Sequence, residues 1–91
     1  MAERRSKMQV LIDILRVIQR EGQTKPTHIL YKANLSHKLL KNHLNLLLEK
    51  GFIEQKNHDG KVYYSITRKG IEFMVEYRKI ENLSSAFGLP I

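Results

Sequence analysis

The chain has 91 residues, of which 42% are hydrophobic and none is cysteine. A chain of this length buries about two-thirds of its unfolded surface, which suits one small domain but not a deep catalytic cleft. The lack of cysteine excludes disulfides, thiolate nucleophiles and zinc–cysteine sites. No run approaches the roughly 18 apolar residues needed to cross a bilayer, so we expect a soluble, cytoplasmic protein.

The chain is strongly basic, with 16 Lys and Arg against 9 Asp and Glu and a net charge of +7. Residues 1–66 hold twelve of the basic and six of the acidic side chains, whereas residues 67–91 are almost neutral. A compact basic domain attracts polyanions, so nucleic acid or an acidic membrane surface is the expected partner. The alternative is a basic surface kept only for solubility.

Local signals place two helices in the first third of the chain. Ser6 and Gln9 form a capping-box pattern, which begins a helix that runs to about Glu21 and stops at Gly22. A short polar link follows, with room for a single-bridge strand. Pro26 suits the first turn of a second helix over residues 26–33, because its fixed φ is already helical.

A tight turn leads into a third helix over residues 36–50, which Ser36 can cap. Two helices joined by so short a turn must cross steeply. Leu40, Leu44 and Leu47 fall on one side of the third helix, and polar, mostly basic side chains fall on the other. The sequence therefore predicts a helix with one packed face and one basic face.

Two strands are predicted at 52–56 and 61–66, joined by a hairpin at Asp59-Gly60. Thr67 can cap a last helix that reaches about residue 85. In this helix a heptad spacing of 4, 3, 4 and 3 links Phe73, Tyr77, Ile80, Ser84 and Phe87. Because this seam would otherwise expose three aromatic rings to water, we expect it to make a homodimer. The alternative is a monomer in which the seam folds back onto the first helix.

The order helix, helix, turn, helix, hairpin, helix predicts a mainly α (α+β) fold, a winged helix-turn-helix with a β-hairpin wing and a C-terminal dimerisation helix. We expect a DNA-binding domain at 1–66 and the dimerisation element at 67–91. Three runs carry a resemblance to a known family: Tyr31-Lys32-Ala33-Asn34-Leu35-Ser36, Glu49-Lys50-Gly51-Phe52-Ile53-Glu54 and Tyr64-Ser65-Ile66-Thr67-Arg68-Lys69-Gly70.

In these runs the chain resembles the archaeal winged-helix DNA-binding proteins of the Sulfolobus 10a type, over about residues 6 to 80. The resemblance implies binding of double-stranded DNA and homodimerisation through an antiparallel C-terminal coiled coil. The chain departs from the pattern at its end, where the last helix stops early and Ser84 occupies a seam position. A shorter dimer contact is therefore expected.

The residues predict two DNA-binding regions. Hydroxyl, ammonium and amide groups at the start and outward side of the third helix can reach phosphates and base edges: Ser36, His37, Lys38, Lys41, Asn42 and Asn45. Around the hairpin tip, the side chains that can reach a phosphate backbone or a minor groove are Lys56, Asn57, His58 and Lys61. Arg4, Arg5 and Lys7 are candidates for a flexible basic arm.

No other chemistry is predicted. His37 and His43 lie on different faces of a helix, so we expect no metal site, with His43 partly buried and His37 a surface donor. No nucleophile elbow, phosphate-binding loop or carboxylate pair is present, so we expect no cofactor and no enzymatic activity.

Two functions of the DNA-binding class remain open, a transcriptional regulator or a low-specificity, chromosome-associated chromatin protein. The alternative from another class is a winged-helix protein–protein interaction module. Such a module would carry an exposed apolar patch on the third helix, of which Leu39 and Leu46 are the only sign.

Overall fold

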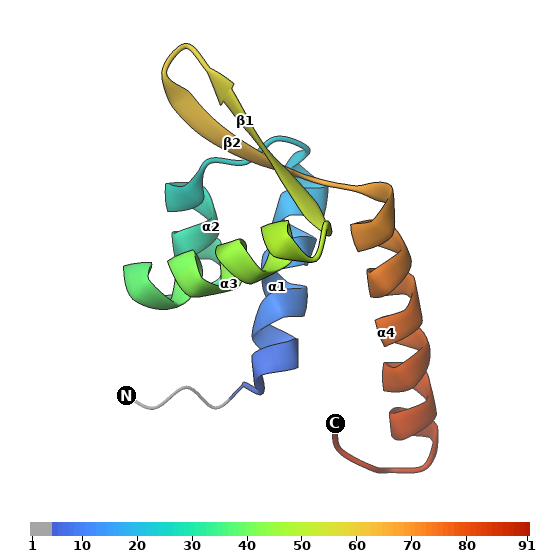
Figure 1. The fold of residues 1–91 in the computed structure, drawn as a ribbon. Helices are drawn as coiled ribbons and strands as arrows, with labels where there is room; N and C mark the ends of the chain where they lie inside the picture. Colours follow the sequence, from blue (N-terminus) through green and yellow to red (C-terminus); the bar gives the residue numbers. More distant parts are fainter. Residues whose placement is uncertain (1–4) are drawn as a thin grey trace.

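The computed structural model describes residues 5–91 and contains four helices and one two-stranded antiparallel sheet (Figure 1). In chain order the elements are α1 (Lys7–Glu21), α2 (Pro26–Lys32), α3 (His37–Glu49), β1 (Ile53–His58), β2 (Lys61–Ile66) and α4 (Arg68–Ala86). The predicted winged helix-turn-helix fold is confirmed. None of the helices in residues 5–91 is long and apolar enough to cross a membrane.

Helix α1 is the centre of the core. Its predicted capping box is present, since the Ser6 hydroxyl accepts from the Gln9 amide at 3.1 Å and the Gln9 side chain accepts from the Ser6 amide at 2.8 Å. The apolar residues of α1 alternate between two stripes, so both sides of the helix are buried: Val10, Leu11, Ile12, Ile14, Leu15, Val17 and Ile18. The helix stops at Gly22, where φ is +83°.

Helices α2 and α3 are held together by a turn of left-handed backbone. Asn34 has a φ of 54°, a conformation that Asn tolerates better than most side chains. The Leu35 amide then donates to the Leu30 carbonyl at 3.0 Å, and the half-buried Leu35 side chain packs against the core. Ser36 caps α3 by accepting from the Leu39 amide at 3.2 Å.

Strands β1 and β2 form the wing, paired from Ile53 opposite Ile66 to His58 opposite Lys61. The Asp59-Gly60 turn has φ values of 51° and 74°. Two positive values are typical of a two-residue type I′ hairpin, so β1 continues to position 58 rather than ending at 56 as predicted. The expected single bridge is also present, between Thr24 and Tyr64.

Helix α4 runs beside α1 in the opposite direction (Figure 1). Thr67 caps its start by accepting from the Gly70 amide at 3.1 Å, as predicted. At its end Gly88 has a φ of 68°, and the Leu89 amide donates to the Ser84 carbonyl at 2.8 Å. This pairing is a Schellman cap, and it folds residues 87–91 back along the helix.

Candidate nucleic-acid interface

The predicted residues of α3 all lie at the surface. Leu40, Leu44 and Leu47 face the core, with exposed fractions of 4% or less. The helical repeat then turns the polar side chains away from the core, and each of them is exposed: Ser36, His37, Lys38, Lys41, Asn42 and Asn45. The structure thus gives α3 one dry face and one face of cations, amides and hydroxyls.

Three of these residues share a groove at the base of the wing. His37, Lys41 and Asn45 line it from α3, and Pro26 of α2 and Tyr64 of β2 close its other side. Burial raises the pKa of the Tyr64 hydroxyl above its ordinary value of 10.0, so the phenol is neutral at pH 7. Pro26 and Tyr64 were not among the residues predicted from the sequence, because only the docking of the wing on the helices brings them to α3.

The wing carries the second predicted group. It projects beyond the helices at the same end of the molecule as the start of α2 (Figure 1). Lys56, Asn57, His58 and Lys61 are exposed on the two strands next to the tip. The His58 Nε2 atom lies 3.5 Å from a carboxylate oxygen of Asp59, and both side chains are mostly exposed. Asp59 therefore offsets part of the positive charge at the tip.

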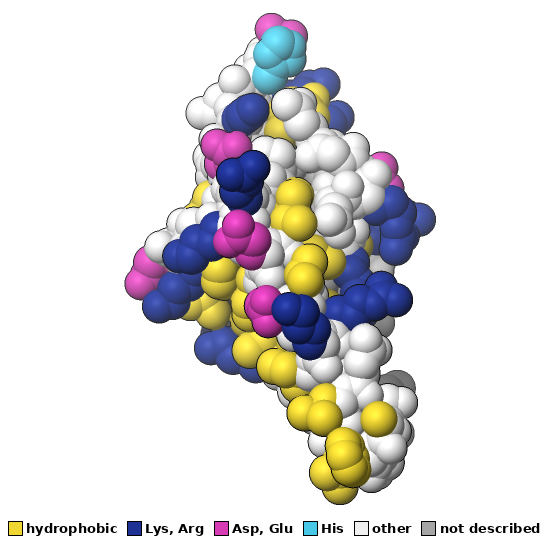
Figure 2. All heavy atoms as spheres, turned by 90° about the vertical axis from the view of Figure 1, so that its right-hand side faces the viewer, with side chains coloured by type: hydrophobic (Ala, Val, Ile, Leu, Met, Phe, Trp, Pro, Cys, Tyr) yellow, Lys and Arg dark blue, Asp and Glu magenta, His cyan; other side chains and the backbone are white. Residues whose placement is uncertain are grey.

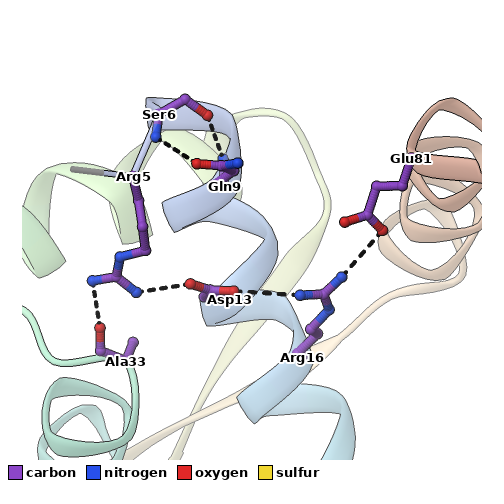
Figure 3. A network of polar contacts seen from close by, with 7 residues as sticks. All are labelled: Arg5, Ser6, Gln9, Asp13, Arg16, Ala33 and Glu81. Carbon is purple, nitrogen blue, oxygen red and sulfur yellow. Dashed lines mark hydrogen bonds and ion pairs between the residues drawn. The ribbon is translucent and has the colours of Figure 1, made fainter. Parts of the chain in front are cut away.

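Arg5 is not part of a flexible arm, which corrects the sequence analysis. Its guanidinium lies 2.7 Å from the Asp13 carboxylate of α1 and donates to the Ala33 carbonyl at the end of α2, at 2.8 Å (Figure 3). Arg4 lies outside the described residues. Sequence reasoning missed this role because Asp13 and Ala33 are distant from Arg5 along the chain.

The same polar network continues to α4. Arg16 lies 3.4 Å from Asp13 and 3.3 Å from Glu81, which points toward α1 from α4 (Figure 3). These contacts join the end of α2, the middle of α1 and the second half of α4. Because both Arg16 contacts are long and half exposed, each contributes little to stability by itself.

The histidines do not form a metal site within the described part of the chain. Among residues 5–91, no three His, Asp or Glu side chains gather closely enough to hold a metal ion. His43 is buried within α3, as expected for a packing residue, with 8% of its surface exposed. Burial, and then the charge of Lys7, lowers the pKa of His43 below its ordinary value of 6.5.

In the structure, some residues of the predicted α4 seam pack within the domain and others are exposed. Tyr77 is buried in the chain's own core, and Phe73 stacks on Phe52 with ring centroids 4.7 Å apart. A monomer therefore does not expose all three aromatic rings, since α4 packs this half of the seam on its own domain, as in the alternative of a seam folded back onto the first helix. Of the three aromatic rings of the seam, Phe87 is the exposed one, with 73% of its surface accessible.

After Tyr77 the helix carries apolar side chains at the surface. Figure 2 shows hydrophobic side chains gathered at the lower end of the molecule, where α4 ends. We call this the C-terminal apolar cluster, and its half-exposed or exposed members are Ile80, Leu83, Phe87, Leu89 and Ile91. They line a shallow hollow together with Ser84 and Pro90. Ser84 itself is half-buried, and its hydroxyl donates to the Leu89 carbonyl.

The helical core, the turn between α2 and α3 and the two-stranded wing define a protein of the winged helix-turn-helix class. A family model described as winged helix-turn-helix matches residues 4–85, and the chain belongs to this family. Within it, the chain is of the Sulfolobus 10a type, as the motifs of the sequence indicated. This membership points to a protein that is not an enzyme.

The relatives support this assignment. Sso10a-2, a DNA-binding protein from Sulfolobus solfataricus, is 31% identical in sequence with a TM-score of 0.76, and the match covers 92% of this chain and 90% of that one. The uncharacterised protein MJ0290 of Methanocaldococcus jannaschii is 35% identical over 80 residues, which are 88% of this chain. This chain therefore spans about a third of the length of that relative, 34%.

A more distant structure shares the fold alone. A MarR family transcriptional regulator from Silicibacter pomeroyi has a TM-score of 0.74 at 17% identity, with coverage of 88% of this chain and 56% of that chain. At this identity the similarity concerns the path of the backbone and not the residues of the surface.

Proposed function

We propose that this protein binds double-stranded DNA, with α3 in the major groove and the wing against the neighbouring backbone or minor groove. The observation that carries the proposal is the exposed polar face of α3, which lies on a helix whose opposite face is wholly buried. An α-helix fits the width of the major groove, where side-chain amides and cations can read base edges. The DNA-binding relative Sso10a-2, similar over nearly its whole length, supports the same assignment.

The side chains divide into two roles. Lys38 and Lys41 bind phosphates, because ammonium groups on flexible stems replace condensed counterions. Asn42 and Asn45 read bases, because an amide can donate to and accept from one base edge at the same time. Ser36 and His37, at the start of α3, contact the phosphate backbone of the DNA. The wing tip adds further DNA contacts through Lys56, Asn57, His58 and Lys61.

A transcription regulator and a chromatin protein would use the same DNA-binding surface. The two roles are therefore distinguished by the sequence specificity of DNA binding. A regulator would bind one operator far more tightly than mixed DNA, whereas a chromosome-associated chromatin protein would bind all duplexes alike. The amides on α3 favour the regulator, because they can read base edges. In either case, the excess of positive charge in the first 66 residues favours a large salt-dependent contribution to the free energy of DNA binding.

Fluorescence anisotropy with a labelled mixed-sequence duplex at several salt concentrations tests the proposal. We expect saturable binding that weakens with salt. The double variant Lys38→Ala/Lys41→Ala should bind more weakly and should lower the slope of log K against log salt by about two. The matched control Arg78→Ala/Lys79→Ala removes the same charge from α4, and it should leave most of the slope intact. Absence of binding at low salt would instead favour the protein-interaction module.

We further propose that the protein is a homodimer and that a second copy docks on the C-terminal apolar cluster. Ile80, Leu83 and Phe87 are each at least half exposed at the end of α4, and the folded-back residues 87–91 add more apolar surface beside them. Contiguous apolar surface of this kind is uncommon on a monomer. The proposed contact uses Ile80, Ser84 and Phe87 of the predicted seam, while Phe73 and Tyr77 support α4 from within the domain.

A further inference from the structure

The turn after α3 is bound by the first turn of α4. Figure 1 shows the chain leaving α3 for β1 beside the start of α4. The Lys69 ammonium donates to the Lys50 carbonyl at 2.7 Å, and the Thr67 hydroxyl donates to the Gly51 carbonyl at 2.6 Å. The Thr67 amide donates to the Phe52 carbonyl at 3.0 Å. Three successive carbonyls that follow α3 are thus bound by Lys69 in the first turn of α4 and by Thr67, the N-cap of that helix.

Side-chain packing adds to these hydrogen bonds. The Phe52 ring stacks on Phe73 of α4, with the two ring planes 8° apart. The Lys69 ammonium also lies 5.3 Å from the centre of the Phe52 ring, a distance at which a cation is attracted to an aromatic face. Both the backbone of this turn and the side chain of Phe52 are therefore in contact with α4.

The Lys69 ammonium adds positive charge at the C-terminal end of α3, next to the C-cap residue Lys50. The C-terminal end of a helix carries partial negative charge on its unpaired carbonyls, which a nearby cation stabilises. The last turn of α3 holds no basic residue, and it ends with the acidic Glu49. Lys69 brings its ammonium to this end from α4. Although Lys69 is exposed, its ammonium is thus engaged in a contact within the protein.

We propose that Lys69 is a positioning residue for DNA binding, which holds α3 at a fixed angle to α4 and so presents the polar face of α3 correctly. Lys69 does this without touching the DNA. The proposal rests on the proposed function of α3. In a dimer joined through α4, the same contact sets the separation of the two recognition helices, and hence the spacing of the two half-sites.

The test compares Lys69→Met with Lys69→Arg and with Lys79→Met, an exposed lysine of α4 whose ammonium contacts only Glu76, at 3.1 Å, in the described structure. We expect Lys69→Met to weaken DNA binding about three- to ten-fold, with the same slope against salt as Lys79→Met. Lys69→Arg, which keeps the cation and its donors, should restore most of the affinity. Amide hydrogen exchange at residues 47–50 should be faster in Lys69→Met and normal in the other two.

The outcomes separate this inference from the proposed function. Unchanged affinity in Lys69→Met would overturn the positioning role, and so would a salt slope reduced by about one relative to Lys79→Met, which indicates a phosphate contact. If the unmodified protein binds no duplex, the proposed function of α3 fails. In that case the hydrogen exchange at 47–50 still decides whether Lys69 holds the end of α3.

Discussion

Gly70 in the first turn of α4 lies directly against the backbone of Phe52. A Cβ atom at position 70 would overlap the Phe52 carbonyl oxygen and would come within 2.7 Å of the Ile66 Cγ1 atom. The backbone of Gly70 is helical, so glycine is needed here for space and not for a special φ. This contact lets α4 approach the turn after α3 closely enough for Thr67 and Lys69 to bind it.

We therefore expect Gly70→Ala to destabilise the protein, although alanine has the higher helix propensity. Overpacking of this kind costs about 1–3 kcal/mol in the free energy of unfolding. Thermal denaturation followed by circular dichroism should show a Tm lower by roughly 5–20 °C. Glu72→Ala, at an exposed position of the same helix, should change the free energy by less than about 0.5 kcal/mol. A Gly70→Ala variant as stable as the unmodified protein would show that the backbone can move apart at no cost.

His43 makes stability depend on pH near neutrality. Burial and Lys7 lower the pKa of His43 in the folded protein below 6.5. As the pH falls below about 6.5, the unfolded chain binds a proton that the folded protein does not, so the free energy of unfolding falls. Well above that pH, from about 7.5, the imidazole is neutral in both states and contributes no pH dependence.

Urea denaturation between pH 7.5 and 5.5 measures this effect in a range where carboxylates remain ionised. We expect His43→Gln to have a flatter dependence of the free energy of unfolding on pH than the unmodified protein. His37→Gln, which replaces an exposed histidine of the same helix, should keep the original dependence. Equal slopes in all three proteins would mean that His43 titrates alike in the folded and unfolded chains.

The dimer contact is tested at the end of α4. Ile80 and Val75 are almost equally exposed, at 51% and 50%, but only Ile80 belongs to the C-terminal apolar cluster. We expect the unmodified protein to be a dimer by light scattering and Ile80→Glu to be a monomer, because a buried carboxylate without a partner opposes association. Val75→Glu should remain a dimer. If Ile80→Glu also remains a dimer, the contact lies elsewhere.

Local signals in the sequence were sufficient for the elements of the fold. Ser6, Ser36 and Thr67 each cap the helix that was predicted to follow, and Asp59-Gly60 forms the expected tight turn. These features depend on residues within three or four positions of one another, so their chemistry can be read along the chain. The exposed face of α3 followed in the same way from its helical repeat.

The tertiary structure decided the use of residues whose partners are far away in the sequence. Arg5 binds Asp13 and the end of α2 instead of forming an arm, and Tyr77 is buried by α1 instead of by a second chain. Helical periodicity says which residues share a face, but not what covers that face. What covers the face of α4 depends on how the helix packs on the domain, where Gly70 closely approaches Phe52. This contact joins residues 18 positions apart, and no local pattern encodes it.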